Sequence, residues 1–145
     1  MGPGFDSIGI ALNLYNRFSM EECDCIDISA TGGERIPNDE TNLVYQCAKR
    51  VYDICGKPMP GLRLIEDCSI PQTRGLGSSS ACTVAGLLGA NALLGGPLHQ
   101  ENIIDMDGQL GKEFLPIEQL RVLSLQLELV LPDDKGKQHQ SQNRR

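Results

Sequence analysis

The 145-residue sequence predicts a single domain that mixes helices and strands, of the α/β or α+β class. Two observations carry this prediction. Segments with strand-like and helix-like hydrophobic spacing follow one another in the order strand, helix, strand, glycine-rich loop, helix. The length suits one domain with a real core, although it is small for an enzyme that encloses two substrates.

The first half of the chain supplies two strands and a helix. Glycines around Pro3 describe a tight loop, and the alternating segment IALNLYNRFSM (10–20) then predicts a strand. A second short strand is expected at CIDISATG (25–32). Residues 39–41 are good helix-start residues, and NLVYQCAKRVYDICG (42–56) has the i, i+3, i+4 apolar pattern of a helix that Gly56 and Pro58 close.

The second half leads into a glycine-rich turn and a buried helix. GLRLIEDCSIP (61–71) alternates like a strand, and the Ala- and Leu-rich run ACTVAGLLGANALLGG (81–96) predicts a helix inside the core. GPLHQENIIDM (96–106) is typical of another helix start. Farther on, LSLQLELVL (123–131) could be a strand, and we expect the polar tail DKGKQHQSQNRR (134–145) to be disordered.

Composition excludes several classes of protein. The net charge of -6 is the wrong sign for binding nucleic acid or an anionic membrane, and the 4% aromatic content does not suit stacking on single strands. No apolar run reaches the roughly 18 residues that span a bilayer. The six cysteines lack a secretory context, so we expect free thiols, no metal finger and a soluble, cytoplasmic protein. The composition favours a small-molecule partner.

The stretch PQTRGLGSSSAC (71–82) is the candidate site. Backbone N–H groups at a helix start, with the positive end of the helix dipole, suit an anion such as a nucleotide triphosphate. Gly75 and Gly77 would let the main chain approach it, and three serines add hydroxyls. The stretch is not a Walker A loop, a Rossmann fingerprint or a GxSxG elbow. Spacing alone does not decide between an anion site and a turn with a good helix cap.

Four segments resemble a known family. PQTRGLGSSSA closely resembles the phosphate loop of the GHMP small-molecule kinases, while GPGFDSIGIALNLYN, IPNDETNLVYQCA and ANALLGGPL resemble homoserine kinases in matching order and spacing. The resemblance covers residues 1–106. It implies an α+β fold, the GHMP kinase amino-terminal domain (ribosomal protein S5 domain 2-like) in truncated form, with residues 107–145 a divergent and partly disordered tail.

The resemblance also implies residue roles. The implied nucleotide-binding residues are Asn42, Pro71, Gln72, Thr73, Arg74, Gly75, Leu76, Gly77, Ser78, Ser79, Ser80 and Ala81. Ser79 would also approach Mg²⁺, and Asp6 would hold the amino group of L-homoserine. Simpler alternatives stay open, in which Ser78–Ser80 merely cap a helix, Asn42 only begins one, Arg74 is solvated, and Asp6 bonds its own turn.

The implied reaction is ATP-dependent phosphorylation of the L-homoserine hydroxyl to O-phosphohomoserine, in threonine biosynthesis, with no side-chain base assigned. The first strand of the family, its acidic Mg²⁺ ligand and its carboxy-terminal domain have no counterpart in this chain. We therefore expect a truncated copy, either active or inactive. A non-catalytic ATP-binding module and another GHMP small-molecule kinase are the alternatives, and a homodimer is left open.

Overall fold

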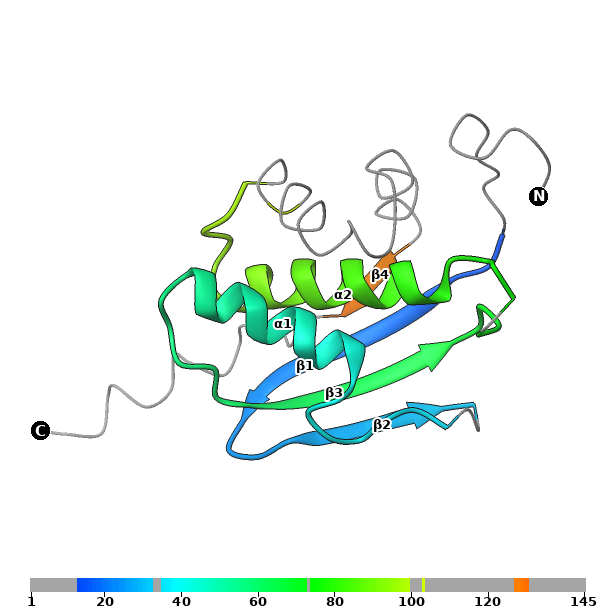
Figure 1. Cartoon of the computed structure of the whole chain (residues 1–145), viewed down its shortest axis with the longest axis horizontal. Helices are drawn as coiled ribbons and strands as arrows, with labels where there is room; N and C mark the ends of the chain where they lie inside the picture. The colour runs from blue at the N-terminus through cyan, green and yellow to red at the C-terminus, as the bar shows by residue number, and fades with distance from the viewer. Residues whose placement is uncertain (1–12, 33–34, 73, 100–102, 104–126, 131–145) are drawn as a thin grey trace, which may run out of the picture.

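A computed structural model describes residues 13–32, 35–72, 74–99, 103 and 127–130 of the chain. The element order along the chain is strand, strand, helix, strand, helix, strand (Figure 1). The bounds are β1 (Asn16–Cys23), β2 (Asp27–Thr31), α1 (Leu43–Ile54), β3 (Gly61–Cys68), α2 (Ser78–Leu93) and β4 (Leu127–Val130).

The four strands form one mixed sheet in the order β2-β3-β1-β4. Strands β1 and β3 are antiparallel, and their register runs from Asn16 opposite Cys68 to Cys23 opposite Gly61. The two outer strands are parallel to their neighbours, β2 to β3 and β4 to β1. Parallel and antiparallel pairs in one sheet, with helices on one side, make this an α+β fold, as the sequence predicted.

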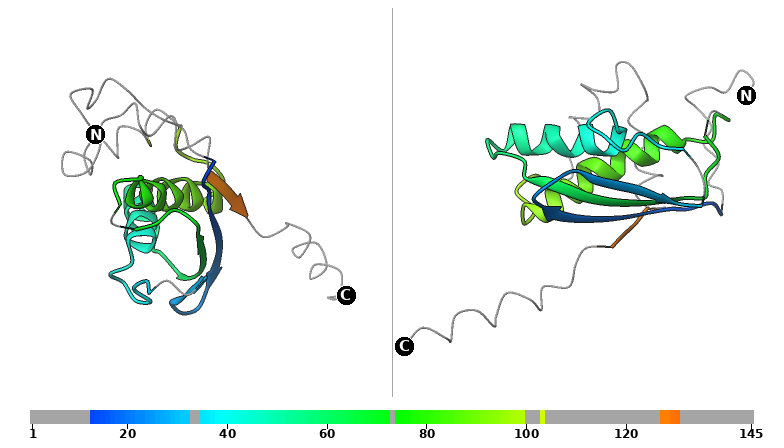
Figure 2. Two further views of the ribbon diagram at one scale, coloured as in Figure 1. Left: turned by 90° about the vertical axis from the view of Figure 1, so that its right-hand side faces the viewer. Right: turned by 90° about the horizontal axis from the view of Figure 1, so that it is seen from below.

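Both helices cover the same face of the sheet, so the domain has two layers (Figure 2). Strand alternation explains the burial: in β1, Phe18 and Met20 point toward the helices, as do Leu62 and Leu64 in β3. The core comprises Phe18, Met20, Ile28, Val44, Tyr45, Cys47, Ala48, Val51, Tyr52, Leu62, Leu64, Ala85, Leu87, Ala90 and Ile103.

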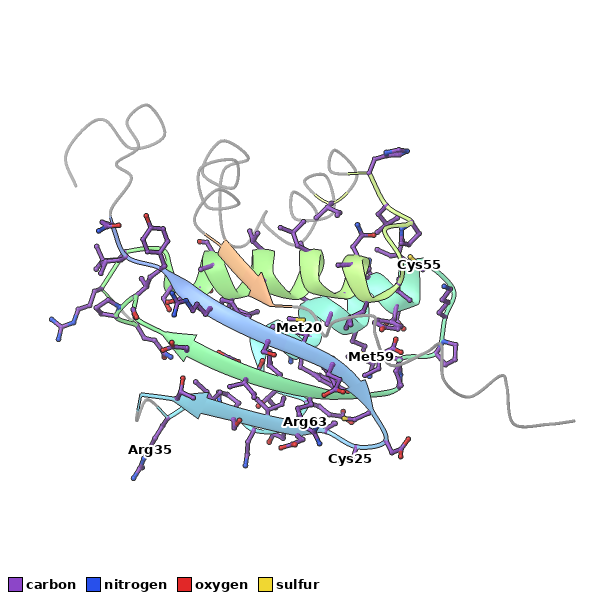
Figure 3. The ribbon with its side chains drawn as sticks, turned by 180° about the vertical axis from the view of Figure 1, so that it is seen from behind. Met20, Cys25, Arg35, Cys55, Met59 and Arg63 are labelled. Atoms are coloured by element: carbon purple, nitrogen blue, oxygen red, sulfur yellow. The ribbon has the colours of Figure 1, made fainter. Side chains whose placement is uncertain are left out.

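The opposite face of the sheet is polar. Figure 3 views this face and labels Arg63, whose guanidinium lies 3.2 Å from a carboxylate oxygen of Glu21 and 3.0 Å from one of Asp27. All three side chains are about half exposed, so solvent screens these pairs and each contributes little to stability. The cross-strand ion pairs are typical of a sheet face that meets water.

Helix α2 packs closely against α1 at Gly86. A Cβ atom at this position would collide with the backbone carbonyl of Val44 and lie 2.6 Å from the Cβ of Cys47. Glycine is therefore the residue that permits this approach of the two helices. Buried residues lie all around α2, as expected for a helix inside the core.

Most predicted elements are confirmed in the described residues, with shifted ends. The first strand begins at Asn16 rather than in the alternating run from residue 10, because its partner β3 ends at Cys68, opposite Asn16. It then continues past Met20 to Cys23. Four residues of the predicted run 123–131 form β4. The tail 134–145 lies outside the described residues, as do residues 100–102 and 104–106 of the helix expected at 96–106. Of the described part of that segment, residues 96–99 are not helical and Ile103 is.

Two further expectations concern the cysteines and membrane crossing. All six cysteines are free, as predicted. Within the described part of the chain, neither helix combines the length and apolar character that crossing a bilayer requires.

Candidate nucleotide-binding site

The candidate residues that the structure describes lie at one end of the domain. Both helices begin at this end, where β3 ends and β1 begins (Figure 1). The connection from β3 to α2 holds the glycine-rich loop, and Asn42 lies directly before α1. Because each helix start carries partial positive charge, two such starts at one end favour an anion there.

The loop has the backbone geometry that its glycines allow. Gly75 has φ 68° and Gly77 has φ 85°, both in the left-handed region that favours glycine. Apart from Gly75 and its two neighbours in the chain, no described residue has an atom within 4 Å of the position that a Cβ of Gly75 would take, and residues 74–76 are exposed. The main chain is thus open to a ligand at this turn.

Helix α2 begins without a side-chain cap. Its N-cap is Gly77, which has no side chain that could accept a hydrogen bond from the first turn. The simpler alternative that Ser78–Ser80 cap the helix is therefore wrong, because the cap position falls on glycine. The backbone N–H of Ala81 donates to the carbonyl of Gly77 at 3.0 Å. The backbone N–H groups of residues 78–80 come before this bond. They belong to the first turn, where N–H groups have no partner within the helix.

The three serines differ in exposure. Ser78 is 8% exposed and Ser80 is 3% exposed, so both hydroxyls belong to the interior, whereas Ser79 is exposed. The backbone carbonyl of Ser79 accepts a hydrogen bond from the Thr83 hydroxyl at 3.1 Å. Ser79 is the serine best placed to reach a ligand.

Asn42 is the N-cap of α1 and is almost fully buried. Its side-chain oxygen accepts from the backbone N–H of Tyr45 at 3.1 Å. Its Nδ2 donates to the carbonyl of Pro37 at 3.0 Å and to Oε1 of Glu66 at 2.7 Å. Both amide protons are used, so the observed role of Asn42 is to hold the start of α1. A role in nucleotide binding stays a prediction.

Glu66 is a residue that the sequence analysis missed. It is 2% exposed, and its Oε2 accepts from the Cys68 thiol at 3.7 Å. Burial raises the pKa of this carboxyl above its usual value, although the hydrogen bonds from Asn42 and Cys68 act to lower it. A signal existed: Glu66 falls on the apolar side of the alternating strand, in step with Leu62 and Leu64.

Thiols surround the same buried region. A hydrogen bond with Cys68 raises the pKa of the Cys82 thiol, and burial and the nearby Glu66 add to the effect. Reactive cysteines have a lowered pKa, so Cys82 is in the environment of an inert thiol.

Asn16 secures the strand that leads into the loop. Its Oδ1 accepts from the backbone N–H of Ile70 at 2.9 Å, although the two residues are far apart in the sequence. The bond fixes the chain where it leaves β3. The Nδ2 of Asn16 is buried and has no hydrogen-bond partner among the described residues.

The remaining predicted residues fall into two groups. Pro71, Gln72, Arg74 and Leu76 are exposed in or beside the loop. Thr73 and Asp6 lie outside the described residues. Among the residues that the structure does describe, no group of three or more His, Cys, Asp or Glu is placed to hold a metal ion.

Comparison with known families agrees with this geometry. The family model described as "GHMP kinases N terminal domain" matches residues 42–119, which include Asn42 and the whole glycine loop. This is more than half of the chain, so the chain belongs to the GHMP kinase family, a class of small-molecule kinases. The match runs beyond residue 106, and a domain boundary there stays a prediction.

Within this family the chain is most readily compared with homoserine kinases. It is 42% identical over 106 residues to a homoserine kinase of Clostridium botulinum (strain Langeland), covering 73% of this chain and 35% of the relative. It is 48% identical over 115 residues to one of Petrotoga mobilis, covering 74% and 38%.

A solved structure from Listeria monocytogenes, assigned as a homoserine kinase, superposes with a TM-score of 0.59 at 39% identity. The superposition covers 74% of this chain and 39% of that chain. The chain thus spans little more than a third of the length of the relatives it matches.

Proposed function

We propose that the chain carries the nucleotide-binding part of a homoserine kinase, which transfers the γ-phosphoryl group of ATP to the hydroxyl of L-homoserine. The observation that carries the proposal is the open glycine loop, which leads into a helix start without a side-chain cap. The backbone N–H groups of residues 78–80 and the helix dipole together suit a triphosphate.

The residues present fit ATP and part of an Mg²⁺ site. Gly75 and Gly77 would let the main chain wrap the phosphates, and the exposed Ser79 would offer its hydroxyl to the phosphates or the ion. Mg²⁺ supplies charge neutralisation between phosphate oxygens when it is bound, and it keeps several of its waters. The amides of the first turn would orient the phosphates, and the buried Ser78 and Ser80 would hold the turn.

The relatives support L-homoserine as the substrate, since they are named homoserine kinases. We assign Asp6 to the amino group of the substrate, because a carboxylate beside an ammonium is a favourable charge-assisted pair. Phosphoryl transfer depends on positioning and charge neutralisation, so the proposal needs no protein nucleophile. The product, O-phosphohomoserine, belongs to threonine biosynthesis, and free thiols fit a cytoplasmic enzyme.

An ADP-release assay with L-homoserine, together with direct measurement of ATP affinity, tests the proposal. Ser79→Ala should weaken ATP binding or turnover by about 10- to 100-fold, because a hydrogen bond to a charged group is lost. Ser29→Ala, an exposed serine on β2, is the control and should change neither. Absence of ATP binding by the folded chain would contradict the proposal.

The same assay separates transfer from binding alone. If ATP binds and Ser79→Ala weakens it, but L-homoserine gives no turnover, the chain is a nucleotide-binding module without chemistry. If turnover occurs, Asp6→Ala should raise the KM for L-homoserine and leave the KM for ATP unchanged. Equal turnover with other small alcohols would indicate another substrate of the family.

A further inference from the structure

Glu66 lies where an acidic side chain is unfavourable. It is 2% exposed on the face of β3 that packs against the helices, in step with the apolar Leu62 and Leu64. Its two hydrogen-bond partners within the described part of the chain, Asn42 and Cys68, are neutral groups. A buried carboxyl with neutral partners costs stability compared with a well-packed apolar side chain. Its presence therefore indicates a role other than core packing.

The contacts of Glu66 join two parts of the candidate site. On one side, its Oε1 accepts from Nδ2 of Asn42, the N-cap of α1, at 2.7 Å. On the other side, its Oε2 accepts from the thiol of Cys68, the last residue of β3, at 3.7 Å. The glycine loop leaves the sheet directly after this strand. Glu66 thus connects the start of α1 to the base of the loop.

The Asn42 carboxamide has no freedom to turn while these bonds are made. Glu66 and the Pro37 carbonyl take its two amide protons, so its oxygen must face α1, where it accepts from the Tyr45 N–H. Without Glu66 one buried amide proton would lose its acceptor, and the carboxamide could adopt other orientations. The first turn of α1 would then lose a fixed cap.

We propose that Glu66 is a positioning residue of the nucleotide site, holding the Asn42 carboxamide and thereby the start of α1 beside the glycine loop. The inference rests on the proposed function, because it assumes that a nucleotide binds at this end of the domain. Glu66 itself need not touch the ligand. It acts through Asn42, and its acceptor oxygen rather than its charge is the group that matters.

Two substitutions separate the oxygen from the charge. Glu66→Gln retains an acceptor for Asn42, so its Kd for ATP should stay within about twofold of the parent value. Glu66→Leu removes the acceptor, and its Kd should rise about tenfold. Leu64→Ala is the matched control, since Leu64 lies on the same strand and face; it should lower stability and leave the Kd unchanged. All Kd values are measured where circular dichroism shows folded protein.

Amide hydrogen exchange at Tyr45 gives a second readout that needs no nucleotide. Exchange at this N–H should become faster in Glu66→Leu relative to neighbouring helix amides, and should stay slow in Glu66→Gln and Leu64→Ala. Asn42→Asp tests the same contact from its other partner. It keeps the inference testable if the Glu66→Leu variant does not fold. It keeps an oxygen for Tyr45 but loses the donor to Glu66, so ATP binding should again weaken.

The outcomes distinguish this inference from the proposed function. ATP binding by the parent chain with an unchanged Kd in Glu66→Leu and Asn42→Asp would overturn the positioning role alone. Equal weakening in Glu66→Leu and Leu64→Ala would also overturn it, because general destabilisation would then be the cause. A parent chain that binds no ATP would overturn the proposed function, and this inference with it.

Discussion

At the residue scale, the site depends on buried polar side chains as well as on its glycines. Asn16, Asn42 and Glu66 are almost fully buried, and each makes a hydrogen bond to a segment far away in the sequence or to a helix start. A hydrogen-bonded polar group inside a core fixes geometry more narrowly than an apolar one. These three residues hold the strand ends and helix start around the glycine loop.

The buried carboxyl of Glu66 makes stability depend on pH. Its pKa is raised in the folded state, so the folded state holds the proton more tightly than the unfolded state does. Its contribution to stability is present below the ordinary value of 4.5 and is lost as the pH rises through the folded pKa. Glu66→Gln should therefore gain stability relative to the parent as the pH rises, and gain least in acid.

Urea denaturation from about pH 5 to about pH 8 measures this difference in the free energy of unfolding. Ser29→Ala, at an exposed position without a titratable group, is the control, and its curve should run parallel to that of the parent. Parallel curves for the parent and Glu66→Gln would show that the carboxyl does not titrate differently on folding.

Two glycines with similar backbone angles give a matched pair. Gly75 in the loop and Gly95 after α2 have φ of 68° and 83°. Apart from each glycine and its chain neighbours, no described residue has an atom within 4 Å of the place that a Cβ would occupy. Alanine at either position should destabilise the fold by about 1 kcal/mol, because the left-handed region disfavours a Cβ. Only Gly75→Ala should weaken ATP binding. Equal ATP affinities of the two variants would argue against ligand contact at the loop.

At the element scale, the contact of α1 with α2 depends on Gly86. Gly86→Ala should destabilise the domain by about 1–3 kcal/mol, since the new methyl group meets the Val44 carbonyl and the Cβ of Cys47. Thr83→Ala, on the same helix, removes one local hydrogen bond and should cost about 1 kcal/mol or less. Thermal and urea unfolding measure both. A Gly86→Ala variant as stable as the parent would mean that the helices can separate without penalty.

The hydrogen bond between Tyr52 and Glu22 joins α1 to the end of β1. The Tyr52 hydroxyl donates to Oε1 of Glu22 at 2.5 Å, and burial followed by this contact raises the pKa of the phenol, so it stays a donor. Tyr52→Phe should lower the free energy of unfolding by about 1 kcal/mol. Urea denaturation checks the value, and an unchanged midpoint would show that the bond contributes nothing net.

The local sequence pattern predicted where helices and strands form better than it predicted which segments contact one another. The helix at 43–54 and the strand at 61–68 follow from spacing and terminal glycines, which are properties of neighbouring residues. The glycine loop was likewise visible in the sequence, because its residue types reflect its own backbone angles. Glu66 was missed since a single acidic residue in an alternating strand usually faces water. The role of Gly86 could not be predicted either, because it depends on a contact with another helix.

At the scale of the whole molecule, the sheet order could not be predicted. Strand β4 pairs with β1, although more than a hundred residues separate them, and β3 lies between β2 and β1. Such pairings depend on burial of one face against the helices, which no local pattern reports. The resulting arrangement brings Asn42 and residues 74–81 to one end, a proximity that spacing alone did not show.

The central claim is that this end of the domain binds the phosphates of a nucleotide. Mapping of backbone amide chemical shifts during titration with ATP tests it most directly. The largest shifts should fall on Gly75, Gly77 and Ser78–Ser80, with smaller ones at the start of α1, and Ser79→Ala should reduce them. Shifts confined to the polar face of the sheet around Arg63, or no shifts at all from folded protein, would contradict the claim.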